Sequence, residues 1–167
     1  MDEQVGSAGG KQNATSVERR GERELVAMRL FDAPAGAVFD AWSRSELFQR
    51  WWVPKSVPGL SLVACDLDVR TGGTYRLEFG MASSGTADFH GRYLEVVANE
   101  RIVWTNDEDE EGAVTTVVFE DRAGKTLLRY HEVYPSSAAL EEALQGSAAA
   151  LPEQFDQLEE MLLGPGD

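Results

Sequence analysis

Residues 60–134 contain a series of short stretches in which apolar and polar side chains alternate, and this series constrains the fold more than any other feature. A period of two is typical of strands with one buried and one exposed face. Connections such as Gly72-Gly73 and Asn99-Glu100 are too short for the crossovers that parallel strands need. The series therefore predicts an antiparallel sheet.

Helical patterns come before and after this series. Asp32 precedes Pro34 after an apolar strand over residues 25–31, which predicts a helix with Asp32 as its cap. Residues 43–46 (Ser-Arg-Ser-Glu) fit a capping box, so a second short helix is predicted there.

The last segment predicts an amphipathic helix. Its apolar residues recur at spacings of 4, 3 and 4, and they are Leu151, Phe155, Leu158 and Leu162. Pro152 predicts either a kink near residues 148–152 or a new helix that starts there. Such a helix has to cover one face of the sheet, and a curved sheet under a single helix tends to leave an apolar cavity.

The predicted fold class is thus α+β, with a curved antiparallel sheet of about seven strands, two short helices after the first strand and a long C-terminal helix. We expect residues 1–22 to be a disordered tail, residues 23–164 to be one domain and residues 165–167 to be a short tail. Residues 81–88 are small and polar and are interpreted as a loop.

The charge of the chain excludes two classes of partner. With 15 Lys and Arg against 29 Asp and Glu, the net charge is −14, so we expect no binding to nucleic acid or to an anionic membrane surface. Residues 136–167 hold seven acids and no Lys or Arg, which predicts a uniformly negative solvent face and a possible basic protein partner. Solubility alone is the simpler interpretation of this charge.

Residues 107–111 are five consecutive acids. They imitate the first half of a calcium loop, but Val118 stands where such a loop needs a bidentate Glu, so an acidic hairpin tip is predicted.

No arrangement of residues indicates a catalytic nucleophile, a metal site or a cofactor. Cys65 is the only cysteine, which rules out an internal disulfide, and its place on the apolar side of a strand favours a structural thiol. His90 and His131 lack metal-ligand spacing. His90, Arg92 and His131 would matter for acid–base chemistry if they pointed inward, but outward placement is favoured. The N-terminus has no secretory pattern, so a cytoplasmic location is expected.

Several segments together resemble the family related to the activator of the heat-shock-protein-90 ATPase. The similar segments are residues 31–34 (Phe-Asp-Ala-Pro), 38–42 (Val-Phe-Asp-Ala-Trp), 51–54 (Trp-Trp-Val-Pro), 68–73 (Asp-Val-Arg-Thr-Gly-Gly), 91–96 (Gly-Arg-Tyr-Leu-Glu-Val), 99–102 (Asn-Glu-Arg-Ile) and 155–158 (Phe-Asp-Gln-Leu). The resemblance implies a helix-grip fold of the SRPBCC superfamily, which includes START domains and the birch pollen allergen. It departs at Ser147 and at Pro152. Chaperone activation belongs to family members with an additional N-terminal domain, for which we expect no room here.

The superfamily commonly holds an apolar ligand between the sheet and the last helix, so we expect the same here. The aromatic and aliphatic residues expected to contact a small hydrophobic ligand are Phe48, Trp51, Trp52, Tyr75, Leu77, Phe79, Trp104, Phe119, Tyr130, Leu151 and Phe155. Because helical neighbours point about 100° apart, one of Trp51 and Trp52 is expected in the core and the other at a cavity mouth. Two alternatives stay open: an enzyme of the polyketide cyclase or hydratase type that uses the same cavity, and a chaperone cofactor or other protein-interaction module.

Overall fold

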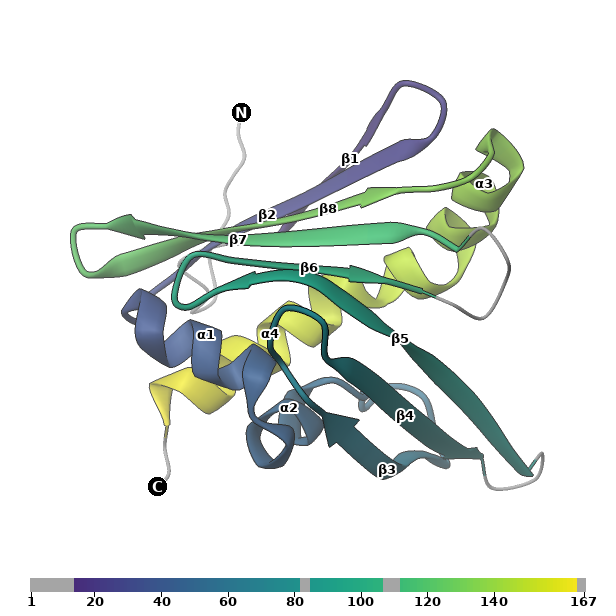
Figure 1. Ribbon diagram of the computed structural model, residues 1–167, viewed down its shortest axis with the longest axis horizontal. Coiled ribbons are helices and arrows are strands. Elements are labelled where there is room, and N and C mark those ends of the chain that lie inside the picture. The colour runs from purple at the N-terminus through teal and green to yellow at the C-terminus, as the bar shows by residue number, and fades with distance from the viewer. Residues whose placement is uncertain (1–13, 82–84, 107–111, 165–167) are drawn as a thin grey trace.

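The computed structural model describes residues 14–81, 85–106 and 112–164. Eight strands form one antiparallel sheet in the order β1-β2-β8-β7-β6-β5-β4-β3 (Figure 1). The strands are β1 (Ser16–Arg20), β2 (Glu24–Phe31), β3 (Leu60–Leu67), β4 (Thr74–Met81), β5 (Gly85–Val97), β6 (Arg101–Thr105), β7 (Val114–Arg122) and β8 (Lys125–Val133). The helices are α1 (Ala35–Ser43), α2 (Ser45–Trp51), α3 (Ser137–Gln145), the 3₁₀ helix η2 (Ser147–Ala150) and α4 (Leu151–Leu163). The predicted α+β class is confirmed.

The strand β1 differs from the predicted tail over residues 1–22. Its residues pair with β2 from Ser16 opposite Met28 to Arg20 opposite Glu24. All five residues of β1 are exposed, so they carry no apolar alternation that a sequence pattern could detect. The described residues therefore place eight strands in the sheet, where about seven were predicted.

The predicted loop over residues 81–88 is wrong at Met81, which belongs to β4, and over residues 85–88, which belong to β5, while residues 82–84 lie outside the described residues. The expected acidic hairpin tip at residues 107–111 lies outside the described residues, as do residues 1–13 and 165–167.

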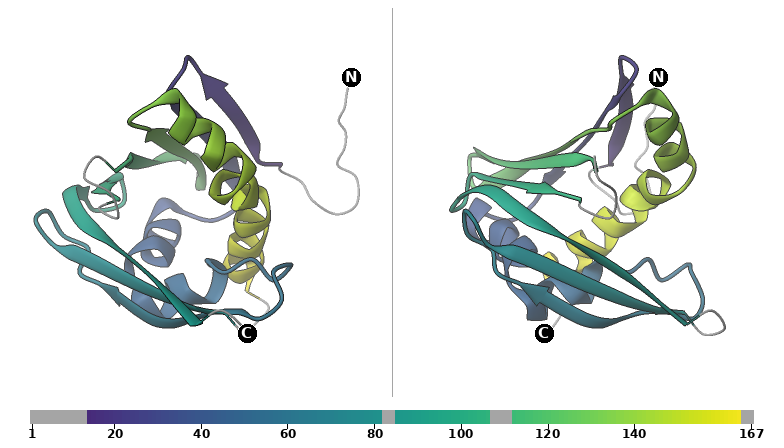
Figure 2. Two further views of the ribbon diagram at one scale, coloured as in Figure 1. Left: turned by 90° about the vertical axis from the view of Figure 1, so that its right-hand side faces the viewer. Right: turned by 45° about the vertical axis from the view of Figure 1, so that its right-hand side comes forward.

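The curved sheet wraps partly around the helices, and α4 runs along its concave side (Figures 1 and 2). Alternation in the strands explains which side chains face the helices. In β8, Thr126, Leu128, Tyr130 and Glu132 are buried, whereas the residues between them are only partly buried. Inward-facing residues of the strands and the apolar faces of the helices thus form one core.

The closing segment consists of separate helical pieces. The helix α3 ends at Gln145, and α4 begins at Leu151 with Pro152 in its first turn, where a missing N–H has no helical partner to lose. Of the two outcomes predicted from Pro152, the new helix is therefore confirmed.

The predicted helix caps in the first half of the chain do not form. The N-cap of α1 is Pro34 and that of α2 is Arg44, and neither side chain caps its helix. The Ser43 hydroxyl instead donates to the carbonyl of Phe39 within α1 at 2.9 Å. Tertiary packing of the apolar faces is what holds these two short helices.

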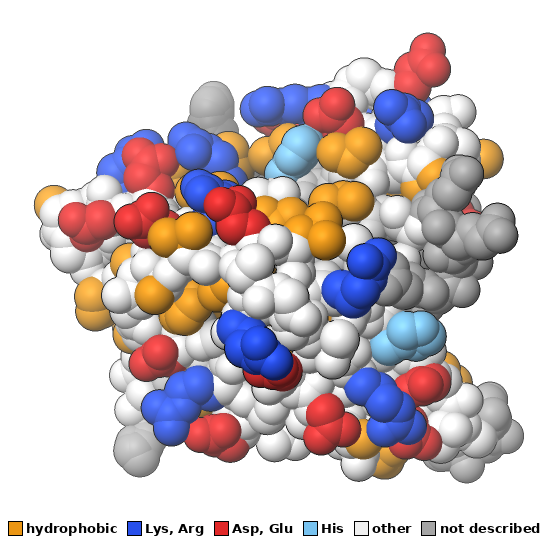
Figure 3. All heavy atoms as spheres, in the orientation of Figure 1, with side chains coloured by type: hydrophobic (Ala, Val, Ile, Leu, Met, Phe, Trp, Pro, Cys, Tyr) orange, Lys and Arg blue, Asp and Glu red, His pale blue; other side chains and the backbone are white. Residues whose placement is uncertain are grey.

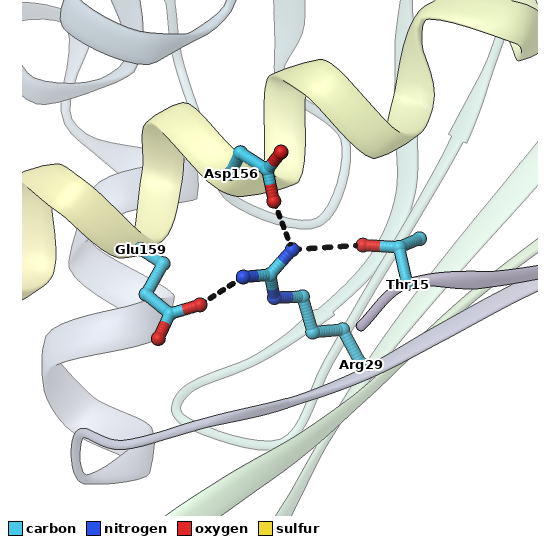
Figure 4. A network of polar contacts seen from close by, with 4 residues as sticks. All are labelled: Thr15, Arg29, Asp156 and Glu159. Carbon is cyan, nitrogen blue, oxygen red and sulfur yellow. Dashed lines mark hydrogen bonds and ion pairs between the residues drawn. The ribbon is translucent and has the colours of Figure 1, made fainter. Parts of the chain in front are cut away.

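A buried ion-pair cluster fixes α4 to the sheet (Figure 4). Arg29 of β2 is 2% exposed, and its Nη1 lies 2.6 Å from Asp156 Oδ1 and donates to Thr15 Oγ1 at 3.1 Å. Its Nη2 pairs with Glu159, one turn further along α4. The guanidinium also lies 5.5 Å from the centre of the Phe31 ring. Strand β2, the residue that precedes β1 and helix α4 are thereby joined at one charged centre.

Candidate functional site

A pocket of about 720 Å³ lies between the sheet, the α1–α2 region and the closing segment. This volume is in the range of small-molecule sites, which run from about 300 to 1,000 Å³. Most of its wall is aromatic or aliphatic, and Val57 and Phe89 are exposed residues that mark where it meets solvent. The pocket is therefore an apolar space open to the outside.

Eight of the eleven residues expected to contact a ligand line this pocket. They are Phe48, Trp52, Tyr75, Leu77, Phe79, Trp104, Tyr130 and Leu151. The β4 residues among them share one strand parity, which turns their side chains inward while Arg76 and Glu78 point out. The pocket thus joins residues that lie up to 103 positions apart in sequence, from Phe48 to Leu151.

The other three expected residues lie in the packed core instead. Trp51 and Phe155 are fully buried, and Phe119 is 3% exposed. The rings of all three pack against Trp42, with centroid distances of 4.8 Å for Trp51, 6.3 Å for Phe155 and 6.5 Å for Phe119. Trp42 itself lines the pocket. These three residues therefore lie behind the pocket wall and support it.

The two adjacent tryptophans at the end of α2, Trp51 in its last position and Trp52 as its C-cap, point in different directions, as predicted. The Trp51 indole donates to the carbonyl of Ala41 at 3.0 Å within the core. The Trp52 ring stacks on Phe48 at 4.7 Å and lines the pocket.

A polar network occupies one end of the pocket and is the feature that the sequence analysis missed. Glu132 is 9% exposed, and its Oε2 accepts hydrogen bonds from Thr115 Oγ1 at 2.7 Å and from the Tyr130 hydroxyl at 2.8 Å. Its Oε1 accepts from the Tyr134 hydroxyl. Asn106 Nδ2 in turn donates to Thr115 Oγ1 at 3.2 Å. The sequence does indicate that Glu132 points inward, because it lies at an even spacing from Leu128 and Tyr130 in the same strand.

Burial raises the pKa of Tyr130 well above its ordinary value, and the nearby Glu132 carboxylate raises it further. The pKa of Tyr134 is raised for the same two reasons, and burial likewise raises that of Tyr93. These phenols consequently stay protonated at neutral pH and act as hydrogen-bond donors.

Two glutamines of α4 hold the segment that follows α2. Gln154 Nε2 donates to the carbonyl of Trp52 at 2.6 Å, and Gln157 Nε2 donates to the carbonyls of Trp51 and Val53 at 2.9 and 2.8 Å. The Gln157 oxygen accepts from the Lys55 amide at 2.9 Å. One wall of the pocket is thus tied to the closing helix by buried hydrogen bonds.

The polar strand residues whose direction was open in the sequence do not line the pocket. His90 and Arg92 are exposed, and His131 Nε2 lies 2.9 Å from Glu24 Oε1 outside the pocket. The favoured outward placement is therefore confirmed for all three.

The Cys65 thiol is half-buried and points toward the carbonyl of Ser45, with Sγ 3.9 Å from the oxygen. Burial raises its pKa to about 11, so almost none of it is the nucleophilic thiolate at neutral pH. A structural role fits this environment.

The acids of residues 136–167 do not give the uniformly negative solvent face expected from the sequence. Asp156 and Glu159 contact Arg29, and Glu141 pairs with Arg19. Glu153 accepts hydrogen bonds from the amide and hydroxyl of Ser56. On the face shown in Figure 3, acidic and basic side chains lie side by side. Several of these acids therefore make contacts within the fold.

Among the described residues, no group of three or more His, Cys, Asp or Glu side chains could hold a metal ion. Within the same part of the chain, no helix is both long and apolar enough to cross a membrane.

The sheet order, the two short helices and the closing helix define a helix-grip fold of the SRPBCC type. The sequence model of the family described as activator of Hsp90 ATPase homolog 1-like protein matches residues 32–163. The chain belongs to this family. A search of the curated proteins found no match.

Solved structures share the fold. A protein from Rhodobacter sphaeroides is 19% identical, with a TM-score of 0.79 over 91% of this chain and 99% of its own. A Staphylococcus epidermidis protein is 25% identical, with a TM-score of 0.77 over 91% of this chain and 96% of its own. An AHSA1-like protein from Aeromonas hydrophila is 19% identical, with a TM-score of 0.65 over 85% of this chain and 97% of its own.

Proposed function

We propose that this domain binds a small hydrophobic molecule between its sheet and the closing helical segment. The observation that carries the proposal is the pocket of about 720 Å³, whose wall is mostly aromatic and aliphatic and comes from both sides of the fold. An apolar ligand there would remove its own surface and that of the wall from water, which is favourable by about 25 cal/mol per Å². Cores that only stabilise a fold are close-packed and contain few voids larger than a water molecule. A space of this size therefore supports a binding role.

The test is a titration with N-phenyl-1-naphthylamine, a neutral apolar fluorophore, on the wild type and two matched variants. Ala143 of α3 lines the pocket, and Ala138 of the same helix is exposed and does not. We expect one probe molecule per chain and a raised melting temperature. Ala143→Phe fills part of the pocket and is expected to weaken binding about tenfold or more, because the added ring occupies space that the probe would otherwise take.

Ala138→Phe adds the same ring to the surface and is expected to leave the affinity unchanged. Melting curves of both variants show whether each is folded. Absence of saturable binding to the wild type, or equal weakening in both variants, would overturn the proposal.

A second candidate is an enzyme of the cyclase or hydratase type that uses the same pocket. Glu132 favours it, because such chemistry requires an inward acid–base group and this carboxylate lines the pocket beside two tyrosine hydroxyls. Conversion of a bound polyketide-like substrate by the wild type and its loss in Glu132→Gln would distinguish catalysis from binding alone. A chaperone-cofactor role through an acidic surface has less support, since several of the acids contact groups within the fold.

A further inference from the structure

Glu132 is a buried carboxylate whose charge has no counterion among the described residues. Its contacts are the hydroxyls of Thr115, Tyr130 and Tyr134, and no Lys, Arg or His of the described ranges pairs with it. All three hydroxyls donate to its oxygens, which is the arrangement of an ionised carboxylate that can only accept. Charged groups buried in proteins are ordinarily paired with an opposite charge or a metal.

The carboxylate also has an acceptor position to spare. From the described residues, Oε2 accepts two hydrogen bonds, whereas Oε1 accepts only the one from Tyr134. An ionised carboxylate offers about four lone-pair sites, so one remains at Oε1 for a donor brought by a ligand. Because Glu132 lines the pocket, that ligand would meet it at the polar end of a mostly apolar space.

The pocket around Glu132 suits a cation in two further respects. The rings of Tyr75, Trp104 and Tyr130 line it, and the faces of such rings attract cations within about 6 Å. Glu142 is an exposed acid that also lines the pocket, so its entrance carries negative charge. The net charge of −14 raises the concentration of cations near the protein as a whole.

We propose that the ligand is an amphiphilic amine, with an apolar body in the pocket and a protonated amino group that binds Glu132. The ammonium group would neutralise the buried charge and donate to the open position at Oε1. This inference rests on the proposed binding function and specifies the chemical class of the molecule that is bound.

The test compares three probes of the same shape at neutral pH: 1-naphthylmethylamine, 1-naphthylmethanol and 1-naphthoate. The amine is expected to bind about tenfold more tightly than the alcohol, because a hydrogen bond to a charged group contributes about 1.5–3 kcal/mol and 1.4 kcal/mol corresponds to a factor of ten. The carboxylate probe is expected to bind most weakly. Equal binding of amine and alcohol, or tighter binding of the carboxylate, overturns the inference while the binding function stands.

Two variants show whether the preference for the amine depends on the charge of Glu132. Glu132→Gln keeps the size of the side chain and removes its charge, and it is expected to abolish the preference for the amine while the alcohol still binds. Glu160→Gln removes the same charge from an exposed position of α4 outside the pocket and is expected to keep the preference. Equal loss in both variants would assign the preference to the overall charge and contradict the role of Glu132.

If Glu132→Gln does not fold, the three wild-type affinities still decide the question. If none of the three probes binds the wild type, the binding function and this inference fail together.

Discussion

Replacing Arg29 with alanine is expected to lower the free energy of unfolding by about 3 kcal/mol. Removing one partner of a buried ion pair typically costs about 3–5 kcal/mol, because the remaining charge is left without compensation. Asp156 and Glu159 keep some contact with water, with 32% and 13% of their side chains exposed, so the loss falls at the lower end of that range. Urea unfolding of the wild type and of Arg29→Ala measures it.

Arg101→Ala is the control, since Arg101 also makes two charged hydrogen bonds, but both go to the Glu95 carboxylate and lie on the surface. Exposed pairs contribute little, so we expect no resolvable change in stability. If Arg29→Ala were as stable as Arg101→Ala, the cluster would not be what holds α4 on the sheet.

Replacing Gly91 with alanine is expected to destabilise the protein by about 3 kcal/mol and to disturb the polar end of the pocket. A Cβ at this buried position of β5 would lie 2.0 Å from the carbonyl oxygen of Thr105 and 2.7 Å from the Tyr75 hydroxyl. That hydroxyl donates to the same carbonyl at 2.8 Å, so strand β6 and the Tyr75 ring would both have to move. Urea unfolding measures the first effect and probe affinity the second.

Gly36→Ala is the control for this glycine. A Cβ there would make only ordinary contacts of 3.8 Å with Asn99, and Gly36 lies in α1, where alanine is favoured by about 0.5–1 kcal/mol. We therefore expect a slight gain in stability. If Gly91→Ala left the free energy of unfolding unchanged, the close contact between Gly91 and the Thr105 carbonyl would be contradicted.

The order of elements was predictable because apolar spacing identifies each one separately. The strands with a buried face alternate, and the helices carry apolar residues three and four positions apart. The strand β1 lacked this signal, because its residues are all exposed and backbone pairing with β2 is what orders them. The predicted N-caps of α1 and α2 were wrong for a related reason. The packing of these helices against the core decides where they begin and outweighs a local capping pattern.

The candidate site was predictable for the residues on alternating strands and less so elsewhere. Which buried aromatic residues face a pocket and which lie behind it depends on packing across the fold. The sequence pattern therefore does not separate Trp51, Phe119 and Phe155 from the residues that line the pocket. The burial of Glu132 and Arg29 could have been predicted from the alternation in their strands. Each has the inward parity of its strand, and a charged residue at such a position predicts a buried partner or a site.

The central claim is that the pocket holds an apolar ligand, and the four tryptophan indoles test it most directly. Trp42, Trp52 and Trp104 line the pocket, whereas Trp51 lies in the core and its indole N–H donates to the carbonyl of Ala41. When N-phenyl-1-naphthylamine is added to ¹⁵N-labelled protein, we predict that the indole signals of Trp52 and Trp104 shift and saturate at one equivalent, and that the Trp51 signal moves least. Unchanged signals of Trp52 and Trp104, or shifts that never saturate, would contradict the claim.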